Sequence, residues 1–156
     1  MTNAYTDVHL SSGAAITMPS TLSKTAKDYR RAALNRYDES RLLYEAGKCT
    51  GAMYLAGYAV ECMLKVLVLT TVPVAQQAEF AKNKFRGSDG HDFEILRTRY
   101  LVRQGGGLPS EIVQLFTLVS DWSTDLRYDP RELKDDEADP FLTAVKGIIT
   151  WAERRV

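Results

Sequence analysis

The feature that most constrains the fold is an apolar segment of about twenty residues in the first half of the chain. Residues 53–72 are long enough to cross a bilayer, but Glu61 and Lys65 lie near their middle. Each central charge would cost about 3 kcal/mol on insertion. A helix that is apolar on nearly every face is also typical of the centre of a helical bundle. We therefore expect a buried central helix and no membrane contact.

The remainder of the chain has the three- and four-residue apolar spacing of helices and no strand pattern of comparable length. We expect the first helix to begin after a cap at Ser20 or Thr21, the fourth to stop before Asp129, and the last to begin at Asp139 and Pro140. A short helical piece is also expected after Pro73. The predicted segments are residues 22–47, 50–72, 76–84, 91–102, 110–128 and 139–151.

These segments predict an all-α fold, an up-and-down antiparallel bundle of four or five helices with a buried central second helix. With 156 residues the chain is expected to form one domain, residues 21–156, behind a flexible N-terminal arm, residues 1–20. No secretory signal pattern opens the sequence, so we expect a cytoplasmic protein. The two cysteines and two histidines have no zinc-binding spacing, and we expect neither a metal nor a cofactor.

Charge is balanced overall but segregated along the chain. Twenty basic and twenty acidic residues sum to zero, which excludes a wholly basic nucleic-acid coat protein. Residues 24–48 and 82–103 each carry a net charge of +3, whereas residues 121–139 carry −5. Such segregation suits a polar partner or an oriented dimer, although a solvated surface of mixed charge is the commoner explanation of any single run.

Glu61 and Lys65 are four residues apart and share one helix face, with Tyr54, Gly57 and Tyr58 one and two turns earlier on the same or a neighbouring face. A buried carboxylate needs a cation and hydrogen-bond donors, so these residues predict either an exposed ion pair on a narrow stripe or a polar network inside the bundle. Arg127 is the arginine that we expect to join such a network, because it is predicted at a helix C-terminus. The alternative for Arg127 is a local ion pair with Asp125 or Asp129.

His91 follows a Gly-Ser-Asp-Gly loop at a predicted helix start, where it either fixes the helix end or serves in acid–base chemistry. His9, the other histidine, lies in the predicted arm, so an imidazole acid or base would have to be His91.

Three segments together resemble the HEPN family of prokaryotic helical bundles. They are Gly51-Ala52-Met53-Tyr54-Leu55-Ala56-Gly57-Tyr58-Ala59-Val60-Glu61-Cys62-Met63-Leu64-Lys65, Gly90-His91-Asp92-Phe93, and Trp122 with Leu126-Arg127-Tyr128. The resemblance covers roughly residues 24–154. It implies a helical bundle that commonly forms a homodimer, often beside a nucleotidyltransferase-like partner in toxin–antitoxin or defence systems.

Many members of this family resemble metal-independent endoribonucleases that use an arginine, four to six further residues and then a histidine on a late helix. This sequence departs from that pattern, because no histidine follows Arg127. Arg86 and His91 do have four residues between them, but they lie before the third main helix. We expect that spacing to be a coincidence that is worth testing.

The leading hypothesis is a HEPN-like module that acts with a partner and does not catalyse efficiently. The partner is expected to be a nucleotidyltransferase-type antitoxin, a nucleotide or RNA. The first alternative is a metal-independent ribonuclease that uses His91 with Arg127 or Arg86. The second is a purely structural dimeric bundle. The residues that we expect to line a binding site or a polar core are Tyr54, Glu61, Lys65, Trp122 and Tyr128.

Overall fold

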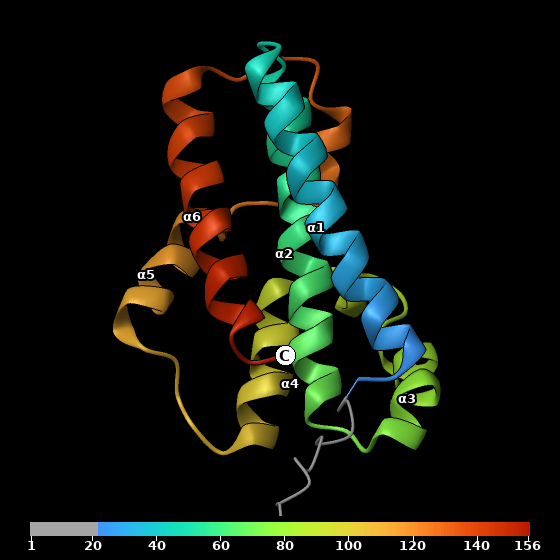
Figure 1. Cartoon of the computed structure of the whole chain (residues 1–156). Coiled ribbons are helices and arrows are strands. Elements are labelled where there is room, and N and C mark those ends of the chain that lie inside the picture. The colour runs from blue at the N-terminus through green and yellow to red at the C-terminus, as the bar shows by residue number, and fades with distance from the viewer. Residues whose placement is uncertain (1–21) are drawn as a thin grey trace, which may run out of the picture.

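The computed structural model describes residues 22–156, and every regular element in this part of the chain is helical. Helix α2 lies at the centre and packs against α1, α4 and α6 (Figure 1). The predicted all-α bundle with a buried second helix is therefore confirmed; the predicted arm, residues 1–20, lies outside the described residues. The α-helices are α1 (Lys24–Glu45), α2 (Cys49–Thr70), α3 (Gln77–Lys84), α4 (Phe93–Gln104), α5 (Ser110–Val119) and α6 (Asp135–Glu153), and the 3-10 helices are η1 (Val74–Gln76), η2 (Ser88–Gly90) and η3 (Thr124–Tyr128).

Helix α2 passes the length and hydropathy test for a membrane span, with a mean hydropathy of 1.6 over its most apolar window. However, 72% of that window is buried inside the bundle. Val60, Met63 and Leu67 are fully buried, and they lie on the helix with the spacing of a core face. The apolar character of α2 is thus accounted for by its central position.

The N-terminus of α1 differs from the prediction. Ser23, not Ser20 or Thr21, caps the helix, and its side-chain oxygen accepts a hydrogen bond from the Ala26 backbone N–H. At the other end Gly47 adopts a positive φ of 73°. A short turn then leads into α2, so α1 and α2 form an antiparallel hairpin (Figure 1).

Gln77 ties the start of α1 to the end of α2. Its side chain is fully buried; the amide nitrogen donates to the carbonyl oxygens of Leu69 and Val72, and the amide oxygen accepts from the Ser23 backbone N–H. Terminal helix carbonyls and the first N–H groups have no partner within their own helices. A single buried glutamine therefore links the cap residue of α1 to the end of α2.

The helix predicted over residues 110–128 is wrong beyond Val119. Helix α5 stops there, and η3 follows as a separate 3-10 helix whose cap is Ser123. The Ser120 hydroxyl donates to the carbonyl of Thr117, a local bond that competes with helix continuation. The chain then turns Trp122 into the core.

The last helix also begins earlier than predicted, at Asp135 instead of Asp139. Three acidic residues occupy its first turn, where the helix dipole favours negative charge. The Glu137 carboxylate accepts a hydrogen bond from the Lys134 backbone N–H, and the helix continues through Pro140.

Candidate functional site

Four polar side chains follow one face of α2 at three- and four-residue spacing: Tyr54, Tyr58, Glu61 and Lys65. Lys65 Nζ lies 2.7 Å from Glu61 Oε1, and the two side chains are only 6% and 3% exposed. The pair is thus a buried network, and the alternative of an exposed stripe is wrong. Charges buried to this degree lose most of their hydration and depend on close partners.

The surroundings of Lys65 supply a second set of favourable contacts. Its Nζ lies 5.4 Å from the ring centroid of Tyr29 on α1 and 5.7 Å from that of Phe85, which follows α3. Aromatic rings attract a cation that has been removed from water. The ammonium group is therefore held by one carboxylate and by the rings from two neighbouring elements.

His91 brings the third partner of this network from a loop thirty residues further along. Its Nδ1 lies 3.0 Å from Glu61 Oε2, while 46% of its side chain is exposed. The preceding Gly90 allows this approach, because a Cβ at that position would lie 2.4 Å from the Phe85 carbonyl oxygen. Both carboxylate oxygens of Glu61 are thus engaged, and Nε2 is the ring nitrogen of His91 that Glu61 does not occupy.

Arg127 lies in η3 and contacts tyrosines. In the part of the chain that the structure describes, Glu61 is bound by Lys65 and His91 and not by Arg127, the cation expected there. Hydrogen bonds to the hydroxyls of Tyr54 and Tyr128 raise the pKa of the Arg127 guanidinium above its usual value. The guanidinium also lies 4.8 Å from the ring centroid of Tyr128, a residue that is 71% exposed. Asp129, which the sequence offered as an alternative partner for Arg127, binds Arg131 instead.

Tyr58 connects the two halves of the polar face. The Tyr54 hydroxyl donates to the Tyr58 hydroxyl at 3.3 Å, and the Tyr58 ring lies edge-on to His91 with a centroid separation of 6.4 Å. Burial, together with the hydrogen bond to Tyr54 and the charge of Glu61, raises the pKa of Tyr58 to about 12. Tyr58 therefore remains a neutral phenol between Arg127 and the Glu61 network.

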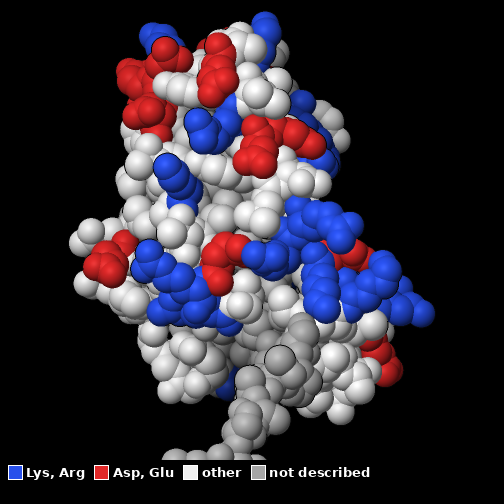
Figure 2. Space-filling view, viewed as in Figure 1, with Lys and Arg blue, Asp and Glu red and all other residues white. Residues whose placement is uncertain are grey.

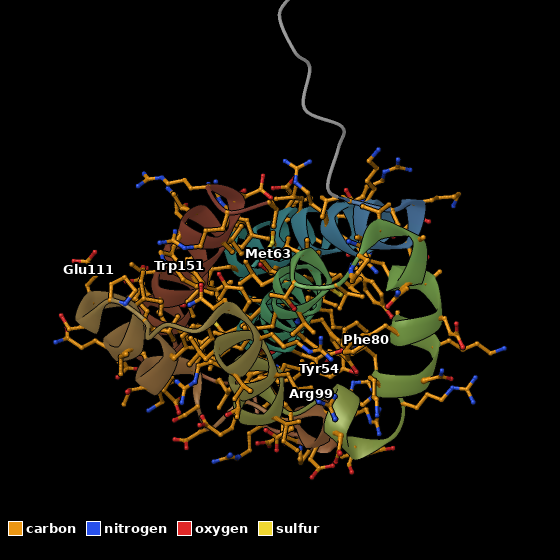
Figure 3. The ribbon with its side chains drawn as sticks, turned by 90° about the horizontal axis from the view of Figure 1, so that it is seen from below. Tyr54, Met63, Phe80, Arg99, Glu111 and Trp151 are labelled. Carbon is orange, nitrogen blue, oxygen red and sulfur yellow. The ribbon has the colours of Figure 1, made fainter. Side chains whose placement is uncertain are left out.

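Trp122 closes the site from the side of η3. Its ring stacks on Phe93 with an interplanar angle of 4°, and its indole N–H donates to the Tyr54 carbonyl oxygen. Gly57 makes room for the indole, since a Cβ there would lie 2.0 Å from Trp122 ring atoms. In the view along the bundle, Tyr54 lies on the side of α4 and η3, opposite α1 and α6 (Figure 3).

A cavity of about 500 Å³ opens beside His91, between the start of α4, the end of α5 and η3. Its lining includes Arg97, whose guanidinium pairs with Glu94 and lies over the Phe116 ring. Neither Arg86 nor Arg127 lines it. The lining residues are Ser88, His91, Asp92, Phe93, Glu94, Arg97, Phe116, Thr117, Ser120, Trp122, Ser123 and Thr124.

The structure thus brings Glu61, Lys65 and His91 into direct contact and places Tyr54, Arg127 and Tyr128 in a second cluster. The sequence placed Tyr58 on or beside the face of Glu61 and Lys65 but did not include it among the expected site residues. Arg97 was missing from the sequence prediction. No local pattern points to Arg97, because only the tertiary placement of α4, α5 and η3 around one cavity makes it a lining residue.

A sequence model of the protein family described as HEPN domain matches residues 26–155. This range includes all the residues of the polar face and of the cavity. None of the curated proteins and none of the solved structures compared with the chain matches it.

Proposed function

Because the chain belongs to the HEPN domain family, we propose that it is a binding module of a toxin–antitoxin or defence-type system that engages its partner at the His91 cavity and does not catalyse efficiently. The observation that carries this proposal is the buried Lys65–Glu61–His91 network beside a cavity that neither Arg86 nor Arg127 lines. The network holds an imidazole at a cavity, whereas no histidine follows Arg127 in the sequence.

The partner that we propose is a nucleotidyltransferase-type antitoxin, with RNA or a nucleotide as the other candidates. The cavity suits a polar ligand, because its lining combines hydroxyl groups with His91, with Arg97 and with the carboxylates of Asp92 and Glu94. We further propose that the module is a cytoplasmic homodimer, the arrangement that is common in bundles of this family.

Co-expression with a nucleotidyltransferase encoded beside the gene tests the proposal. We expect the two proteins to copurify, and we expect His91→Ala or Arg97→Ala to weaken the complex by at least tenfold while the fold is retained. Arg86→Ala is the matched control, because this exposed arginine lies outside the cavity. A strictly monomeric protein that binds no such partner, no RNA and no nucleotide would contradict the proposal.

One specific contact supports a ribonuclease as the second candidate function. A carboxylate on Nδ1 fixes the orientation of an imidazole and leaves Nε2 to exchange a proton with a ribose hydroxyl. Glu61 is placed to do this for His91, and Arg97 is the cation at the cavity that could stabilise a charged phosphate.

A cleavage assay separates the two candidates. Labelled RNA is incubated with a high concentration of the protein in the presence of a metal chelator, and the proposed binding module leaves it intact. Cleavage that is lost in His91→Ala and retained in Arg86→Ala would instead favour the ribonuclease. A purely structural bundle predicts normal partner binding by the double variant Glu61→Gln, Arg127→Gln.

A further inference from the structure

Helices α1 and α6 carry a basic surface that the His91 site does not use. Two segments form it: residues 24–31 of α1, and residues 146–155 at the end of α6 and just beyond it. The Arg30 Nε and Nη2 atoms bind the Glu153 carboxylate across 123 positions of sequence, so the two segments lie side by side. The sequence pattern by itself did not indicate that these two segments are neighbours.

The two acidic residues of these segments are already engaged. Asp28 pairs with Lys24 at 2.7 Å, and Glu153 pairs with Arg30. Seven cations stand against these two acids, so five positive charges are uncompensated within the segments. We define the α1/α6 basic surface by the five exposed cations that remain, namely Lys27, Arg31, Lys146, Arg154 and Arg155.

This surface is separated from the His91 site. Figure 2 shows the largest group of Lys and Arg in a band across the lower half of the face that carries α1 and α6, with some Asp and Glu among them, whereas the upper end carries Asp and Glu together with further Lys and Arg. The view along the bundle places α1 and α6 opposite the side on which Tyr54, α4 and η3 lie (Figure 3). The excess of cations in the two segments therefore presents a positive surface to an approaching polyanion.

The composition of the surface favours a nucleic acid over an acidic protein. Stable protein interfaces are centred on buried apolar or aromatic anchors. The large hydrophobic side chains that the described part of the chain exposes, Leu42, Val74, Val102, Val113, Leu118 and Tyr128, all lie outside the two segments. Contacts to a phosphate backbone need only correctly placed cations.

We propose that the α1/α6 basic surface binds the phosphate backbone of a nucleic acid without reading its sequence. This inference goes beyond the function proposed for the His91 site and does not depend on it. If all five cations contact phosphates, the logarithm of the affinity for single-stranded RNA falls with the logarithm of salt concentration with a slope of about −3.5. Affinity then falls about 100-fold between 50 and 200 mM salt.

Fluorescence anisotropy with a labelled twenty-nucleotide single-stranded RNA tests the proposal in the full chain. We expect Lys27→Ala, Arg31→Ala to weaken binding at least tenfold at 100 mM salt and to reduce the slope to about −2. The matched control is Lys82→Ala, Lys84→Ala, which removes the same net charge from exposed positions on α3 and should leave both quantities almost unchanged. Both double variants change only exposed side chains, and circular dichroism checks their folding.

Two further measurements distinguish this surface from the His91 site and a nucleic acid from an acidic protein. His91→Ala removes none of the five cations, so its salt slope should stay at about −3.5 even where RNA also enters the His91 cavity, and a failure of the His91 site and a failure of this surface then give different results. A labelled polyglutamate peptide of matched charge should bind more weakly than the RNA. Three results would overturn the proposal. They are equal RNA affinity of the α1 and α3 double variants, RNA binding that does not depend on salt, and tighter binding of the polyglutamate than of the RNA.

Discussion

Glu61 Oε2 lies 3.0 Å from His91 Nδ1, so a carboxylate that is 3% exposed holds an imidazole that is 46% exposed. The other carboxylate oxygen of Glu61 lies 2.7 Å from Lys65 Nζ. The buried pair therefore connects the interior of the bundle to the cavity. A change at Glu61 or Lys65 should affect both stability and the position of His91.

Removing one partner of the buried pair should be costly. We expect Lys65→Met to lower the free energy of unfolding by about 3–5 kcal/mol, because it leaves Glu61 with a buried charge that His91 alone must compensate. The double variant Glu61→Leu, Lys65→Met should recover most of that loss, since neither charge then remains. Urea unfolding followed by circular dichroism measures both.

Lys24→Met is the control for this comparison. Lys24 also pairs with a carboxylate four residues away, but its side chain is 90% exposed. We expect a change of less than about 1 kcal/mol. Similar losses for Lys24→Met and Lys65→Met would contradict the importance of burial.

Gly57 should tolerate no side chain while Trp122 keeps its position. A Cβ at residue 57 would lie 2.0 Å from the indole, whereas a Cβ at Gly51 would lie 3.3 Å from the flexible end of Leu43. We expect Gly57→Ala to destabilise the protein by about 1–3 kcal/mol and to shift tryptophan fluorescence. Gly51→Ala should be neutral or stabilising by up to about 1 kcal/mol, because alanine favours helix. Equal effects of the two variants would argue against the close packing of Trp122.

Gln77 should be needed for the junction of α1 and α2. Gln77→Ala would leave two carbonyl groups and one N–H without the bonds that the amide now makes. We expect a loss of about 2–4 kcal/mol, together with faster amide hydrogen exchange at the end of α2. Gln76→Ala, which changes an exposed neighbour, should alter stability by less than about 0.5 kcal/mol. No difference between the two variants would refute this role.

Stability should decline in alkaline solution because of two groups beside Glu61. Burial, together with the charge of Glu61, raises the pKa of Cys62 from 9.0 to about 11, and burial also raises the pKa of Tyr58 from 10.0 to about 12. The folded state holds these protons more tightly than the unfolded state does. Their contribution is therefore complete below pH 9 and is lost as pH rises through 11 and 12.

The free energy of unfolding, measured by urea titration between pH 8 and 10.5, checks this expectation. The decline should be smaller in Cys62→Ala, by an amount on the order of 1–2 kcal/mol. An identical pH dependence in the wild type and in Cys62→Ala would show that the thiol does not contribute.

Several parts of this structure follow from local patterns in the sequence. The all-α fold follows from apolar residues at helical spacing, and the central place of α2 follows from its apolar faces. The Glu61–Lys65 pair follows from a four-residue separation, which puts both side chains on one helix face. The end of α4 follows from Gly105, which adopts a positive φ of 75° after the last helical residue.

The tertiary structure decided which distant groups meet. His91 reaches Glu61 from a separate loop, whereas Arg127, the cation expected there, contacts Tyr54 and Tyr128. Gln77 links the cap residue of α1 to the end of α2, and the Arg30–Glu153 pair brings two basic segments together. Spacing along a helix is set by its 3.6-residue turn and can be read locally. Contacts between segments depend on how whole helices pack, and no local pattern in this chain contains that information.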